Sequence, residues 1–145
     1  SLLTQASGTV YALRILRSNG LTPPALWDVT HATLIARLSY ASPAWWGFVD
    51  ANSKQRLQAL LKKLIKQGFL SPNLGTFNDL CSLADQKLFE SIITNHNHVL
   101  HHLLPPVKVQ HYDLRSQPHN RTLPIINQER SKQNFLKRML YSDIY

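Results

Sequence analysis

The chain has 145 residues, and its 16 lysines and arginines against 8 acidic residues give a formal net charge of +8. This length allows a sizeable hydrophobic core, and the charge favours a polyanionic partner, with a membrane surface as the competing interpretation. The single cysteine, Cys81, excludes an intrachain disulfide and a zinc site built from several cysteines. There is neither an apolar run of about 18 residues nor a secretory signal, so we expect a soluble protein inside the cell, in the nucleus or cytoplasm, without a membrane partner.

The pattern predicts a first helix over residues 2–17, which ends at Asn19-Gly20 because glycine readily adopts the left-handed conformation that terminates helices. A central helix over residues 22–42 follows, with Thr22 as its cap, Pro23 in its first position and a stop at Pro43 and Gly47. Its apolar positions form two stripes, Leu26, Val29, Thr33, Ala36 and Tyr40, and Trp27, Leu34, Leu38, Ala41 and Trp45. Together they cover most of its circumference, so we expect this helix in the middle of a bundle, with His31 as a hydrogen-bonded core residue.

A third helix is predicted over residues 54–67, capped by Asp50 or Ser53 and closed by Gly68. Its apolar face consists of Leu57, Leu60, Leu61, Leu64 and Ile65, and its other face of Lys54, Arg56, Lys62, Lys63 and Lys66, without an acid. Such a basic face is either merely solvated or contacts phosphates, and the sequence leaves both open. We predict one buried cluster of Leu26, Val29, Leu34, Leu38, Tyr40, Trp45, Leu57, Leu61 and Leu64.

Beyond Gly68, Thr76 and Asp79 form a weak capping box that opens a helix to about Thr94, with Cys81 on its apolar stripe. A short helix capped by Asn97 is expected to end at the two prolines of residues 105–106. From residue 107 onward the helical period disappears until a last short helix over residues 131–140.

The predicted fold class is therefore all-α, a small bundle of about five helices followed by a basic, partly extended arm with a short terminal helix. We expect a three-helix bundle in residues 1–69, further helices packed on it in residues 70–106, and the arm in residues 107–145.

The spacing of histidine and acidic residues along the sequence indicates whether they could form a metal or catalytic site. His98, His101 and His102, with His96 nearby, have a spacing that could share a metal ion on one helix face, but no His-Glu-x-x-His pattern or second ligand cluster completes the site. Two-metal nucleotidyl transfer needs paired acids, and the nearest ones, Asp79, Asp85 and Glu90, lie singly on one helical stretch. No Gly-rich phosphate loop or Gly-x-Ser-x-Gly elbow is present. We predict no catalytic residues, no metal site and no cofactor in this chain.

The arm combines aromatic and basic side chains at Tyr112, Arg115, His119 and Arg121. In an extended segment these groups suit contact with the backbone of RNA and stacking on its bases. The alternative is that Tyr112 and Leu114 only anchor the arm to the bundle.

Two blocks do not follow from helix physics alone, Tyr40-Ala-Ser-Pro-Ala-Trp-Trp-Gly47 and Arg138-Met-Leu-Tyr141. Together with other segments they resemble the C-terminal part of reverse transcriptases from non-LTR (LINE-type) retrotransposons, the jockey-like group especially. The other matching segments are residues 11–17 with 20–21, 38–39 with 48, 56–57, 77 with 80–81, 85 and 88–89, 98–101 with 103–106, 112–115, 119–124, 134–135 and 143–145.

The resemblance implies that residues 2–68 correspond to the thumb, which holds the template-primer duplex, and that the basic remainder is a post-polymerase region. The family's metal-binding aspartates lie in the palm, which this sequence lacks, so Mg²⁺ would belong to the parent RNA-directed DNA polymerase. The implied partners are RNA, an RNA–DNA hybrid and the upstream palm of the same polyprotein. A first residue of Ser1 rather than methionine agrees with a piece of a longer protein. The alternatives are a helical protein-interaction module and an inert remnant of a truncated element.

Overall fold

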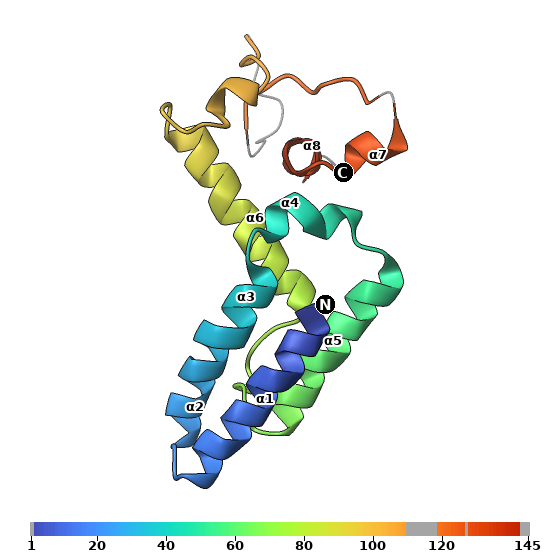
Figure 1. Cartoon of the computed structure of the whole chain (residues 1–145). Coiled ribbons are helices and arrows are strands. Elements are labelled where there is room, and N and C mark those ends of the chain that lie inside the picture. The colour runs from blue at the N-terminus through green and yellow to red at the C-terminus, as the bar shows by residue number, and fades with distance from the viewer. Residues whose placement is uncertain (1, 110–118, 127, 143–145) are drawn as a thin grey trace. The chain divides into compact units, whose positions relative to one another are not determined.

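The computed structural model describes residues 2–109, 119–126 and 128–142, and in this part of the chain every regular element is a helix (Figure 1). Extended backbone pairs at an isolated antiparallel bridge between Val107 and Arg121. The predicted all-α class is confirmed. None of the helices in the described part is both long and apolar enough to cross a membrane.

The chain packs into two compact units, which are described separately. Unit 1 consists of residues 1–42 and 49–81, and unit 2 consists of residues 43–48 and 82–145. The boundaries expected after residues 69 and 106 lie inside these units and stay a prediction.

Unit 1 begins with α1, Leu2–Ser18. It ends as predicted at Gly20, which has φ 91°, and the amide of Leu21 donates to the carbonyl of Leu16 at 3.2 Å. This left-handed closure reverses the chain, and α1 then packs against the next helix, α2.

The central helix differs from its prediction. It consists of α2 (Pro23–Thr30), a π-helical segment (His31–Ile35) and α3 (Ala36–Ser39), so it ends before Ser42. A π-helical turn re-phases the side chains that follow it, and here the neighbours Leu34 and Ile35 are both buried. The hydroxyl of Thr30 donates to the carbonyl of Leu26 at 2.7 Å, just before this segment.

The central helix also differs from its prediction in its burial, its capping and its end. His31 and Ala36 are exposed and Tyr40 is 79% exposed, so the helix buries one face rather than its whole circumference. Thr22 occupies the cap position, but its side chain makes no capping hydrogen bond. Pro43 lies in the first turn of α4 (Ser42–Trp45), where the missing amide hydrogen costs nothing, so it opens a new helix instead of ending the old one.

The third predicted helix is confirmed as α5, Ala51–Lys66. The carboxylate of Asp50 accepts from the amide of Ser53 at 3.1 Å, and Gly68 closes the helix with φ 77°. The residues of unit 1 that are buried include Leu13, Leu26, Leu34, Ile35, Leu38, Leu61, Leu64, Phe69, Leu70, Phe77 and Cys81. Of the expected core, Val29 and Leu57 are half-buried, and Trp45 is half-buried and belongs to unit 2.

The helix α6, Phe77–Thr94, contains the boundary between the units. Its predicted capping box is confirmed, because the amide of Thr76 donates to Asp79 at 2.7 Å and the amide of Asp79 donates to the Thr76 hydroxyl at 3.2 Å. Instead of a helix capped by Asn97, a turn leads to a short 3-10 helix, His101–Leu103.

Unit 2 also contains a 3-10 turn, Trp46–Phe48, and ends in α7 (Glu129–Lys132) and α8 (Phe135–Tyr141), where one helix was expected. Asn134 interrupts the helix because its side chain accepts from the amide of Leu136 at 3.0 Å and so caps α8. The core of unit 2 consists of Phe89, Ile92, Leu104, Phe135 and Leu140.

Candidate nucleic-acid interface

The basic face of α5 is the most uniform charged surface of unit 1. Arg56, Lys62, Lys63 and Lys66 are exposed, whereas Leu61 and Leu64 on the opposite side are buried. Lys54, the fifth predicted contact, is half-buried and lies on the apolar side of the helix, at an angle between those of Leu61 and Ile65. The helix has no acidic residue within its bounds, so the four exposed cations, named here the α5 basic face, create a local positive potential.

A pocket of about 220 Å³ lies between α1 and α5 and extends this face. It is lined by Val10, Tyr11, Arg14, Leu60, Lys63, Leu64 and Gln67. Lys63 therefore belongs both to the basic face and to the pocket, and Arg14 adds a cation from the facing helix. Tyr11 is 67% exposed beside them. We call this hollow the α1–α5 pocket.

The end of α5 is held in place by contacts with the first two helices. The guanidinium of Arg17 donates to the backbone carbonyl of Gln67 at 2.7 Å and lies 4.6 Å from the centre of the Phe69 ring. The indole of Trp27 donates to the carbonyl of Gly68 at 3.2 Å. A cation over an aromatic ring and two side-chain hydrogen bonds thus fix the residues that follow Lys66.

The arm residues predicted to contact RNA differ in whether the structure describes them and in how far they are buried. Tyr112 and Arg115 lie outside the described residues. His119 is 8% exposed, so little of its ring is accessible for the stacking expected of it, and that role stays a prediction. Its Nε2 donates to the carbonyl of Leu140 at 2.9 Å, its Nδ1 accepts from the amide of Arg121 at 3.2 Å, and its ring lies edge-on to Phe89. Both ring nitrogens are satisfied inside unit 2, which explains the burial.

Arg121 is half-buried and its guanidinium donates to the carbonyl of Pro105 at 2.9 Å. Backbone hydrogen bonds reinforce this contact, from Lys108 to Asn120 at 2.7 Å and from Thr122 to Pro106 at 2.9 Å. Arg121 therefore ties the described part of the arm to the segment after the 3-10 helix, a role that its position in a basic, extended stretch did not indicate.

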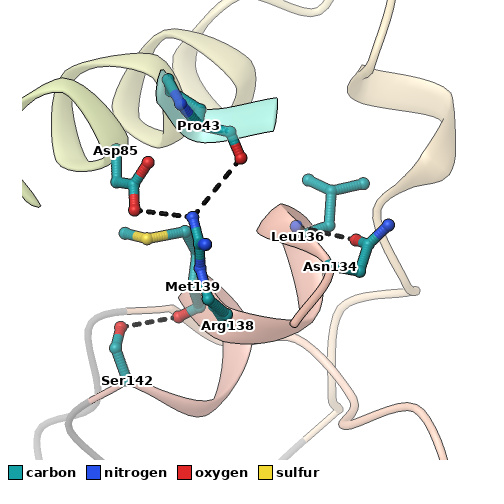
Figure 2. A network of polar contacts seen from close by, with 7 residues as sticks. All are labelled: Pro43, Asp85, Asn134, Leu136, Arg138, Met139 and Ser142. Atoms are coloured by element: carbon teal, nitrogen blue, oxygen red, sulfur yellow. Dashed lines mark hydrogen bonds and ion pairs between the residues drawn. The ribbon is translucent and has the colours of Figure 1, made fainter. Parts of the chain in front are cut away.

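Unit 2 contains a partly buried ion pair that the sequence did not indicate. Figure 2 shows the guanidinium of Arg138, from α8, between the carboxylate of Asp85 at 2.8 Å and the carbonyl of Pro43 at 3.4 Å. Asp85 is 7% exposed, and burial raises its pKa although the charge of Arg138 and its hydrogen bond lower it. A Cβ on Gly47 would overlap Arg138, so glycine permits this approach. Pro43 and Gly47 of the first specific block thus lie beside Arg138 of the second.

The remaining titratable candidates have structural partners. His101 donates through Nδ1 to the carbonyl of Ile92 at 2.7 Å, and its Nε2 lies 3.3 Å from Nδ1 of His96. Over the described ranges, no group of three or more histidine, cysteine, aspartate or glutamate side chains could hold a metal ion. Asp79 caps α6, hydrogen bonds from Thr76 lower its pKa, and Cys81 is fully buried.

Comparisons of the chain with models of protein families, with curated proteins and with solved structures found no match. Sequence reasoning found the α5 basic face from its period alone. It did not identify Tyr11, Arg14 and Gln67 as residues of the site. The available sequence signal was weak, namely a tyrosine one turn before an arginine on the first helix.

Proposed function

We propose that the chain is a nucleic-acid-holding module of a retrotransposon reverse transcriptase, C-terminal to the catalytic palm. In this proposal the α5 basic face contacts the phosphates of an RNA–DNA template-primer. The observation that carries it is four exposed cations on one helix face without an acid, beside a pocket to which Arg14 adds positive charge.

Contacts of this kind supply affinity without reading sequence, because each cation that neutralises a phosphate releases condensed counterions. A rigid helix suits the task better than a loose tail, since less conformational entropy is lost on binding. The fixed C-terminal end of α5, held by Arg17 and Trp27, supports that geometry.

The resemblance in the Tyr40–Gly47 and Arg138–Tyr141 blocks supports the assignment to this class of polymerase. Under the proposal, chemistry with Mg²⁺ belongs to a palm elsewhere in the same polyprotein, and this chain positions the duplex. The described acids are consistent with such a division of labour, because Asp50 and Asp79 cap helices and Asp85 pairs with Arg138.

The test compares two variants of equal charge. Lys62, Lys63 and Lys66 are changed together to Gln in one, and Lys87, Lys108 and Lys132 in the other. Binding to a short fluorescent RNA–DNA hybrid is measured by anisotropy at fixed ionic strength. We expect the first variant to bind more weakly than the second, because only its lysines line the proposed interface. Equal weakening of both would mean that total charge, and not this face, attracts the nucleic acid.

A second candidate, a protein-interaction module, is favoured by a hollow of about 560 Å³ in unit 2. It is lined by Phe48, Leu103, Pro105, Pro124, Gln128, Arg130, Ser131, Asn134, Leu136, Lys137 and Leu140. Phe48 and Leu103 are 52% and 54% exposed. An apolar hollow with basic residues at its edge would suit an acidic, partly apolar segment of a partner. Salt-dependent binding of the hybrid, compared with binding of an acidic protein, separates this candidate from the first.

A further inference from the structure

We infer that the α1–α5 pocket holds one unpaired base of a single-stranded overhang next to the duplex. The inference rests on the proposed function, because the phosphates beside this base would be those bound by the α5 basic face.

The size and floor of the pocket suit a single ring system. Its volume of about 220 Å³ is smaller than the roughly 300–1,000 Å³ of pockets that enclose drug-sized ligands. Val10, Leu60 and Leu64 contribute apolar side chains to its lining. A planar base can pack against such side chains, whereas the sugar and phosphate would stay outside, in contact with water.

The rim of the pocket contains the groups that single strands need. Tyr11 is 67% exposed, so its ring is available as a stacking platform. Arg14 and Lys63 come from opposite helices and line the same pocket, where they can pair with the phosphates on either side of the base. An exposed aromatic ring together with cations is the combination found in sequence-tolerant single-strand binding.

The experiment uses the full chain and RNA–DNA hybrids that are identical except for their ends: blunt, with a short adenine overhang, or with a uracil overhang. Affinities are measured by anisotropy for wild type, Tyr11→Ala and the control Tyr40→Ala, which removes another exposed tyrosine of unit 1. We expect the adenine overhang to bind about tenfold more tightly than the blunt end. This gain should be lost in Tyr11→Ala and kept in Tyr40→Ala.

The outcomes separate this inference from the proposed function. If blunt duplexes bind through the α5 basic face but an overhang adds nothing, or if Tyr11→Ala keeps the gain, the pocket inference is wrong and the proposed function stands. Absence of binding to every hybrid would overturn the proposed function itself.

Discussion

At the scale of single residues, the pair of Asp85 and Arg138 defines how α8 is attached within unit 2. Arg138 reaches both Asp85, on α6, and the carbonyl of Pro43, and Gly47 provides the space (Figure 2). A buried charge is costly unless it is paired, so each partner depends on the other. This dependence gives a structural reason for an arginine and a glycine in two blocks that lie far apart in the sequence.

The ion pair leads to a stability prediction. Arg138→Met should lower the free energy of unfolding by about 3 kcal/mol, because it leaves the carboxylate of Asp85 buried and unpaired. Adding Asp85→Leu should recover part of this loss, since no charge then stays buried. Urea denaturation followed by tryptophan fluorescence measures both, with the exposed Lys87→Met on α6 as control. If Arg138→Met alone were as stable as wild type, the stabilising role of the ion pair would be contradicted.

The pKa of Asp85 provides a second prediction. Burial raises this pKa in the folded state, so folding takes up a proton in the range between the ordinary value and the raised one. The stability contributed by Asp85 should therefore fall as the pH rises through that range. Asp50 and Asp79 have lowered pKa values, so their contributions are present at neutral pH and are lost as the pH falls.

Carbon-detected NMR titration can follow the Asp85 carboxyl directly. We expect a pKa above that of an ordinary aspartate, and a higher one still in Arg138→Met, where the opposing positive charge is gone. A value below the ordinary range in wild type would mean that the arginine outweighs burial.

At the scale of elements, α5 combines a buried and a charged side within one helix. Leu61→Ala should destabilise the protein by roughly 2–5 kcal/mol, because Leu61 is 2% exposed and its loss leaves a cavity. Its neighbour Lys62 is exposed, and Lys62→Ala should change stability by no more than about 0.5 kcal/mol. Thermal or urea unfolding of the two variants provides the comparison, and equal effects would contradict the assignment of the two faces.

The outcome of sequence reasoning also differs by element. For α5, the Asp50 cap, the apolar period and Gly68 all agree, and the helix was predicted to within a few residues. The central helix was predicted less well because a π-helical turn changes its phase at His31, and a fixed period cannot detect such a change. Local sequence signals were therefore sufficient to predict a helix where the cap, the apolar period and the terminating glycine agreed.

The candidate site shows the same limit. Charges on one helix face can be read from spacing, so the α5 basic face was found. The α1–α5 pocket depends on tertiary contacts such as Arg17 with Gln67, which are 50 residues apart, and no local pattern records them. The same is true of His119, whose burial results from its contacts with Leu140 and Phe89.

At the scale of the whole molecule, the net charge of +8 attracts any polyanion, so binding alone would not distinguish a specific interface from general attraction. What distinguishes them is the number of phosphates contacted and the residues responsible. Counterion release measures that number, because the logarithm of the binding constant falls linearly with the logarithm of the salt concentration.

The most direct measurement is therefore the salt dependence of binding to a short RNA–DNA hybrid, for wild type and for the variant with Lys62, Lys63 and Lys66 changed to Gln. With a slope of about −0.9 per phosphate for duplex DNA, we expect a steep slope for wild type. The triple variant should flatten it by roughly one unit per lost contact, whereas the control at Lys87, Lys108 and Lys132 should not. A shallow wild-type slope, or one that the triple change leaves unaltered, would contradict the assignment of the α5 basic face as a nucleic-acid interface.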